Sequence, residues 1–133
     1  MAARVLDGTR IAADIRSELV ARVEACTLAA RRPPTLGILL IGDDAASEVY
    51  VNTKSKIGDA LGLKVDVVRL PETATLDKAK EVVCRFNRSR DHDGILGQAP
   101  LPSALGTAAG RTLLRRLILR KTSTAFIQPT SAG

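Results

Sequence analysis

The stretch Thr35-Leu-Gly-Ile-Leu-Leu-Ile41, followed by Gly42, decides the fold of this chain. It is apolar on both of its alternating faces, so a strand formed here would have no side that faces water. Strands of this kind lie in parallel sheets whose two faces are both covered by helices. The stretch therefore predicts a three-layer α/β sandwich with a mainly parallel sheet.

Helical patterns flank this strand on both sides along the chain. After it, Asp43 or Asp44 can cap a helix that runs to about Leu61, with Gly62 as its stop. Before it, four aliphatic residues recur at every fourth position and predict one apolar face of a helix that ends near Ala29. These four residues are Ile11, Ile15, Leu19 and Val23.

The same alternation continues toward the C-terminal end. Residues 65–70 predict a second strand, and a third helix then starts from Thr73 or Thr75. The short apolar segment Gly94-Ile-Leu-Gly97 predicts a third strand. Helix and strand thus alternate three times, as in sheets built with right-handed crossovers. The third helix has an apolar face made of Leu76, Ala79, Val82, Val83 and Phe86.

The charge of the chain is concentrated at its C-terminal end. The 133 residues carry a formal net charge of +6, but residues 1–110 carry only +1. Single-strand nucleic-acid binders stack bases on aromatic side chains, and Tyr50, Phe86 and Phe126 are the only aromatic residues. We therefore expect no nucleic-acid partner. A small basic module that binds nucleic acid through its tail stays open as a rival interpretation.

Targeting and metal signals are weak in this sequence. No apolar run approaches the roughly 18 residues of a membrane span, and residues 1–7 resemble no signal peptide. We expect a cytoplasmic protein with no membrane partner. Cys26 and Cys84 lie far apart and predict neither a disulfide nor a metal site. Asp43 and Asp44 are interpreted as helix caps, and His92 as a solvated side chain.

Four polar residues are candidates for chemistry. Ser47, Tyr50 and Lys54 share one helix face, at the strand end where ligands of such sheets gather. A tyrosine ring suits an aromatic ligand, and a lysine partly withdrawn from water can have a lowered pKa and move protons. Gln98 follows the third strand and can donate and accept hydrogen bonds. On spacing alone, the simpler interpretation is a half-buried Tyr50, a solvated Lys54 and a turn-capping Gln98.

Five segments, in order and at the family's spacing, resemble the methylenetetrahydrofolate dehydrogenase/methenyltetrahydrofolate cyclohydrolase family. The resemblance covers residues 4 to about 105 and implies the folate-binding N-terminal catalytic domain of a homodimeric, bifunctional enzyme of one-carbon metabolism. It implies interconversion of methylene-, methenyl- and formyl-tetrahydrofolate, with NADP or NAD as the cofactor and no metal. The segments are Leu6–Gly8, Ile41–Ser47, Tyr50–Lys56, Leu70–Thr73 and Asp93–Pro102.

The resemblance also implies roles for individual residues. Lys54 is then the proton-transfer residue, and Gln98 holds Lys54 and the substrate in place. Gly97 and Ala99 stand where the family favours valine and leucine, which removes apolar bulk beside the pocket. The substrate-binding residues implied by the resemblance are Ser47, Tyr50, Gln98, Pro100 and Leu101.

The segment near the C-terminus departs from the family pattern. Residues 121–125 are Lys-Thr-Ser-Thr-Ala. A DNA sequence that encodes the family's Lys-Asp-Val-Asp-Gly can encode these five residues when it is translated one base out of frame. The same decoding fits Arg116 to Gly133, so we infer a frame slip between about Leu105 and Arg115. The coding DNA would test it, and an independently evolved basic tail is the alternative. Thr124 then occupies the place of the family's substrate-binding aspartate.

The expected organisation is a partial catalytic domain at residues 1–105 and a disordered basic tail at 106–133. On this interpretation the dinucleotide-binding domain is absent, so the chain alone is not expected to transfer hydride. Impaired cyclohydrolase activity through Lys54 remains open, and so does a non-catalytic fragment or isoform that pairs with an intact subunit. A mitochondrial location of the parent enzyme also remains open.

Overall fold

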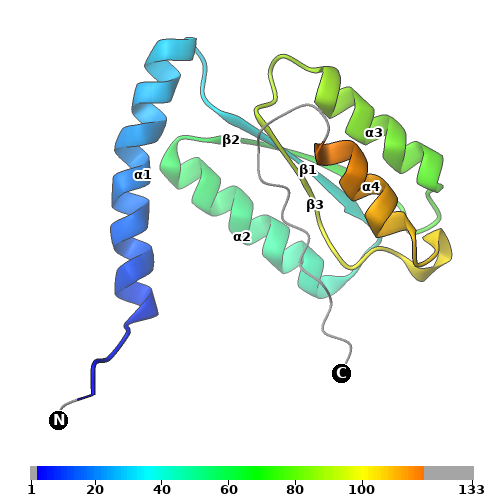
Figure 1. The fold of residues 1–133 in the computed structure, drawn as a ribbon, viewed down its shortest axis with the longest axis horizontal. Helices are drawn as coiled ribbons and strands as arrows, with labels where there is room; N and C mark the ends of the chain where they lie inside the picture. The colour runs from blue at the N-terminus through cyan, green and yellow to red at the C-terminus, as the bar shows by residue number, and fades with distance from the viewer. Residues whose placement is uncertain (1–2, 119–133) are drawn as a thin grey trace.

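Residues 3–118 are described by the computed structural model, and the predicted tail from residue 119 onward lies outside the described residues. Helices and strands alternate along the chain in the predicted order (Figure 1). The elements are α1 (Gly8–Ala30), β1 (Thr35–Ile41), α2 (Ala45–Leu61), β2 (Lys64–Leu70), α3 (Leu76–Arg88), β3 (Gly94–Gly97), a 3-10 turn (Ser103–Leu105) and α4 (Ala109–Ile118).

The three strands form one parallel sheet with the order β2-β1-β3. The central strand β1 is the apolar stretch identified in the sequence, and its Ile38 pairs with Val67 on one side and Leu96 on the other. The side chains of residues 38–41 are at most 2% exposed. The prediction that this stretch lies inside a parallel sheet covered on both faces is confirmed.

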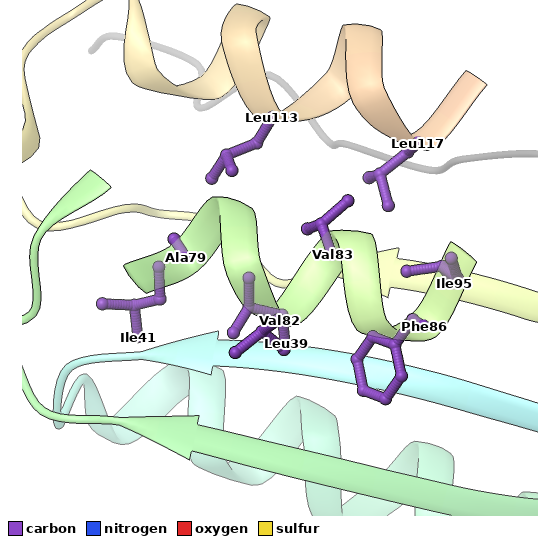
Figure 2. Close-up of a cluster of buried hydrophobic side chains, with 9 residues drawn as sticks. All are labelled: Leu39, Ile41, Ala79, Val82, Val83, Phe86, Ile95, Leu113 and Leu117. Carbon is purple, nitrogen blue, oxygen red and sulfur yellow. The ribbon is translucent and has the colours of Figure 1, made fainter. Parts of the chain in front are cut away.

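Two separate apolar cores lie on the two faces of the sheet. On one face α2 packs through Val51 against Ile38 and Leu40 of β1. On the other face Leu39 and Ile41 form one apolar cluster with side chains of α3 and α4, and Figure 2 shows Leu113 and Leu117 of α4 pointing toward α3. The alternation of side chains along β1 therefore divides its four aliphatic residues between the two cores. The three-layer α/β sandwich is confirmed.

Residues 106–118 differ from the disordered tail that we expected. They include α4, whose Leu113 and Leu117 are each 4% exposed and point toward Val83 of α3 in Figure 2. Leucines at positions i and i+4 lie on one face of a helix and can cover a core together. In the sequence, the basic residues of this segment drew attention away from its apolar helix face. The predicted end of the folded domain at residue 105 therefore lies too early in the chain. Residues 119–133 lie outside the described part of the chain.

Helix α1 does not bury the apolar face that its sequence predicts. Val23 is 8% exposed, whereas Ile11 and Ile15 are 47% and 51% exposed. Within residues 3–118, α1 contacts mainly α2 and stands at the edge of the molecule (Figure 1). Periodicity correctly identified an apolar helix face, but nothing in the described part of the chain covers the N-terminal half of it.

The helix ends follow the capping residues in the sequence. The carboxylate of Asp7 accepts hydrogen bonds from the backbone N–H groups of Thr9 and Arg10. Asp44 and Thr75 accept from the backbone N–H groups three residues further on, at the starts of α2 and α3. Gly62 ends α2 with a φ of 82°, a conformation that favours glycine. These caps explain why the predicted boundaries lie within a few residues of the observed ones.

His92 is not the solvated side chain that the sequence suggested. Its side chain is 14% exposed, and its Nε2 and Nδ1 atoms lie 2.8 Å from Asp66 Oδ2 and 2.7 Å from Ser89 Oγ. Its ring centroid also lies 4.8 Å from that of Phe86. Asp66 is 26 residues away in sequence, so the local charged loop gave no sign of this partner.

Gly58 provides a test of how closely α2 approaches the sheet. A helix-interior glycine ordinarily costs about 1 kcal/mol relative to alanine, yet a Cβ at buried Gly58 would lie 2.6 Å from Val65 Cγ2 of β2. We predict that Gly58→Ala lowers the free energy of unfolding by about 1 kcal/mol, because the clash outweighs the helix propensity. Urea unfolding measures it, with exposed Asn52→Ala on α2 as the control. A stabilised Gly58→Ala variant would contradict the close approach.

Candidate functional site

The candidate site lies at the carboxyl ends of β1 and β3. Helix α2 starts directly after β1, and Asp44 caps it by accepting a 2.8 Å hydrogen bond from Ser47 N. This backbone hydrogen bond lowers the pKa of Asp44. Beyond β3, the backbone N–H of Gln98 donates to the Leu39 carbonyl at 2.9 Å. The first turns of α2 and the loop after β3 are thereby brought to the same edge of the sheet.

Lys54 and Gln98 form the central contact of the site. Lys54 Nζ donates a 2.9 Å hydrogen bond to Gln98 Oε1, although the two residues are 44 positions apart in sequence. Gln98 Nε2 donates in turn to the carbonyl of Ala99 at 2.9 Å. Because both ends of its amide are engaged, Gln98 holds the lysine amine in a defined position.

Ser47 connects α2 to the loop after β3 through a hydrogen bond. Its side chain is buried, and its Oγ donates a 3.3 Å hydrogen bond to the same Ala99 carbonyl that Gln98 contacts. The peptide bond between Ala99 and Pro100 is cis. Sequence reasoning did not find this role of the Ala99 carbonyl, because every residue has a backbone carbonyl and no residue type marks the one that is used.

Lys54 is partly shielded from solvent, and this burial affects its proton affinity. The side chain is partly buried, and this burial lowers the pKa of Lys54 from its ordinary value of 10.5. Its Nζ lies 5.5 Å from the centroid of the Tyr50 ring, within the range of a cation–π contact. Tyr50 itself is 57% exposed, so its ring is available to a flat ligand. Together these side chains offer an amine that can exchange a proton beside an open aromatic face.

The predicted site residues divide into two groups. Ser47, Tyr50, Lys54 and Gln98 are linked by the contacts described above. Pro100, Leu101 and Gln98 also line a cavity of about 420 Å³ to which Tyr50 and Lys54 do not contribute. The other walls of this cavity come from β3, from α4, from the segment that joins them, and from single residues of β1 and α3. The loop of residues 98–102 therefore separates the lysine from an apolar hollow.

Gly97 lies beside this hollow and offers a test of the packing there. A Cβ at Gly97 would meet only Leu117 Cδ1, at 4.0 Å, which is an ordinary contact distance. We predict that Gly97→Val raises the free energy of unfolding by about 1 kcal/mol, because it fills empty apolar space and stiffens a strand. Thermal unfolding followed by circular dichroism measures the change. Gly8→Val on exposed α1, where a Cβ would meet nothing within 4 Å, is the control; a Gly97→Val variant that is no more stable contradicts the prediction.

Among residues 3–118, no three His, Cys, Asp or Glu side chains gather in a way that could hold a metal ion. The helices of the same part are too short or too polar to cross a membrane.

The fold and the site define an α/β domain that presents a lysine–glutamine pair at the carboxyl edge of a parallel sheet. A family model described as the catalytic domain of tetrahydrofolate dehydrogenase/cyclohydrolase matches residues 6–116. The chain belongs to this family. The match extends beyond residue 105 and includes most of α4, in agreement with the packing of that helix.

Individual relatives support the same assignment. The bifunctional protein FolD of Acidiphilium cryptum is 38% identical over 109 residues, which are 82% of this chain and 38% of the relative. The bifunctional protein FolD of Nitratidesulfovibrio vulgaris is 41% identical over 102 residues, or 77% of this chain and 36% of the relative. The chain thus spans less than two fifths of the length of these curated relatives.

Solved structures of similar proteins agree with the fold. The methylenetetrahydrofolate dehydrogenase/cyclohydrolase FolD of Campylobacter jejuni matches with a TM-score of 0.81 and 29% identity, over 90% of this chain and 41% of that one. The Trypanosoma brucei FolD, solved with NADP cofactor and an inhibitor, matches with a TM-score of 0.77 and 28% identity, over 86% and 38% of the two chains.

Proposed function

We propose that this chain carries the folate-binding and proton-transfer part of the family's one-carbon chemistry, the hydrolysis of methenyl- to formyl-tetrahydrofolate. The observation that supports this proposal most directly is the 2.9 Å hydrogen bond between Lys54 Nζ and Gln98 Oε1. It places a lysine of lowered pKa next to the exposed ring of Tyr50, in a member of a folate-dependent enzyme family.

The proposed reaction uses Lys54 as a general base. Water adds to the cationic carbon of the methenyl bridge, and the neutral amine of Lys54 takes the proton that this water loses. One carbon–nitrogen bond of the bridge then breaks. The hydroxyl group that came from the water gives up its proton and becomes the carbonyl of a formyl group on one nitrogen, while the departing nitrogen keeps the electron pair and takes up a proton. Gln98 orients the amine, and the ring of Tyr50 stacks on the pterin. The net products are formyl-tetrahydrofolate and one proton.

The turns that follow β1 and β2 do not fit the pyrophosphate of a nicotinamide dinucleotide. Such cofactors need a strand-to-helix turn whose free N–H groups face the phosphates without a negative side chain between them. At the turn from β1 to α2, Asp43 and Asp44 stand at that position, and Asp44 itself accepts the Ser47 N–H. Glu72 lies in the turn from β2 to α3. No hydride-transfer step is therefore assigned to these two turns.

Hydrolysis of methenyl-tetrahydrofolate by the purified chain tests the proposal. Loss of the methenyl absorbance should be faster with the folded chain than with buffer or with the heat-unfolded chain. A folded chain that neither binds methenyl-tetrahydrofolate nor speeds its hydrolysis would overturn the proposed function.

A second candidate function follows from the length of the relatives. Because the chain spans only 36–38% of the FolD proteins described above, we also consider a non-catalytic role in which it pairs with an intact family subunit. Titration of this chain into a full-length FolD protein would change the dehydrogenase rate of that enzyme if the two associate. An unchanged rate together with separate sedimentation of the two proteins would exclude this role.

A further inference from the structure

The cavity of about 420 Å³ between β3 and α4, which we call the α4 cavity, has a floor of buried aliphatic side chains. Its volume lies in the range of roughly 300–1,000 Å³ that is typical of small-molecule sites. The floor belongs to the apolar cluster drawn in Figure 2 and consists of Leu39, Val83, Ile95, Leu113 and Leu117.

Two glycines leave the space of the α4 cavity open. Gly97 of β3 and Gly110 of α4 both line it. Among residues 3–118, a Cβ at Gly97 would meet only Leu117 Cδ1, at 4.0 Å, and a Cβ at Gly110 would meet only Leu101 Cδ1, at 3.9 Å. Protein interiors contain few voids larger than a water molecule. A space of this size beside two absent side chains can therefore take in atoms of another molecule.

The lining of the α4 cavity indicates the kind of molecule that fits. Within residues 3–118 no charged side chain lines it, although 26% of the residues of the chain are charged. An ion placed on this floor would lose its water without gaining a partner, which is strongly unfavourable. The exposed rim includes Ser103 and Thr107, whose hydroxyl groups can donate or accept a hydrogen bond. The cavity thus combines an apolar interior with a neutral polar edge.

We propose that the α4 cavity binds a small, uncharged and mainly apolar molecule, with its rings or chain on the floor and one neutral polar group at the rim. This site is separate from the one at Lys54. The floor residues Leu39 and Ile95 pack on the face of the sheet that α3 and α4 cover, whereas α2, which carries Lys54, packs on the opposite face. Binding here is independent of the hydrolysis proposed above.

A neutral alcohol with two aromatic rings, 2-naphthalenemethanol, is the probe for this site. Titration calorimetry with the full chain should show saturable binding of the alcohol. 2-Naphthoate has the same rings but carries a carboxylate, so it should bind at least about tenfold more weakly. The methyl resonances of Leu113 and Leu117 should shift when the alcohol is added, because both side chains lie on the floor.

Substitutions on two different walls should close the cavity. Gly97→Val and Gly110→Leu should each weaken binding of the alcohol at least about tenfold, since the new side chains occupy the space that its rings need. Gly8→Val adds a side chain on α1, where a Cβ would meet nothing within 4 Å, and should leave the affinity unchanged. Circular dichroism shows whether each variant keeps its fold.

Lys54→Met distinguishes this site from the candidate site. It should bind the alcohol as tightly as the unchanged chain does, and a loss of binding would show that the alcohol lies beside Lys54 instead. The proposal is also overturned if the unchanged chain does not bind the alcohol, or if both cavity-filling variants bind it as well as the unchanged chain. Equal affinity for 2-naphthoate would contradict an uncharged ligand.

Discussion

Lys54→Met should slow the hydrolysis of methenyl-tetrahydrofolate by about 10²–10⁴-fold, the range that a positioned general base contributes. Methionine has a similar length but no amine, so it removes the proton acceptor while still covering the Tyr50 ring. Substrate binding should change much less, since Tyr50 and Gln98 remain. The measurement is the rate of loss of the methenyl absorbance at saturating substrate, compared between the two proteins.

A substitution that keeps the positive charge separates base catalysis from charge stabilisation. Lys54→Arg retains a cation and a donor that can reach Gln98, but a guanidinium does not lose its proton in proteins. The rate should therefore fall as far as it does in Lys54→Met. If Lys54→Arg keeps the rate of the unchanged chain, Lys54 acts as a fixed cation and the base mechanism is wrong.

The pH dependence of the same reaction follows from the burial of Lys54. The active base is the neutral amine, so the rate should rise with pH through the pKa of Lys54 and level off above it. Because burial lowers this pKa from 10.5, the rise should occur at lower pH than for an ordinary lysine. The rate of Lys54→Met should lack this rise.

Lys56 is the matched control for both variants. It lies on α2 two positions after Lys54, is exposed, and borders the groove between α1 and α2 instead of the candidate site. Lys56→Met should hydrolyse the substrate at the rate of the unchanged chain. An equal loss of activity in Lys56→Met would show that the reaction depends on the overall positive charge of α2 and not on the Lys54–Gln98 contact.

The parts of the fold that the sequence predicted well are those in which local pattern and burial agree. The strand at 35–41 is apolar on both faces, and only the centre of a covered sheet suits it. The apolar stripe of α1 was equally clear as a pattern, yet Ile11 and Ile15 are exposed. Periodicity tells which side of a helix avoids water, but it does not tell which surface covers that side.

The candidate site was predictable to the extent that it depends on strand ends. Lys54 and Gln98 follow two neighbouring parallel strands, so their proximity could be expected although 44 residues separate them. The Ala99 carbonyl and the partners of His92 could not be predicted in this way. The Ala99 carbonyl accepts from Ser47, and His92 contacts Asp66; each of these contacts joins two distant segments, and the local sequence contains no signal for it.

Gly37→Ala should lower the free energy of unfolding by about 1–3 kcal/mol, the usual range for overpacking a core. A Cβ at Gly37 of β1 would lie 2.9 Å from both Phe86 Cδ1 and Phe86 Cε1. Phe86 is fully buried, and its ring also lies against the imidazole of His92, so it has little room to move. Alanine fits a strand better than glycine does, hence any loss of stability must come from this contact. Urea unfolding followed by circular dichroism should show a lower midpoint with an unchanged slope.

A smaller side chain at residue 86 shows whether the ring causes this loss. Phe86→Leu alone should destabilise the domain, because it leaves empty space in the core of β1, α3 and α4. In the Phe86→Leu background, however, Gly37→Ala should cost little, since the methyl group then occupies part of that space. The two substitutions are in contact and should be strongly non-additive. If Gly37→Ala costs the same free energy in both backgrounds, the packing of Phe86 on the backbone of β1 is not what excludes a side chain at residue 37.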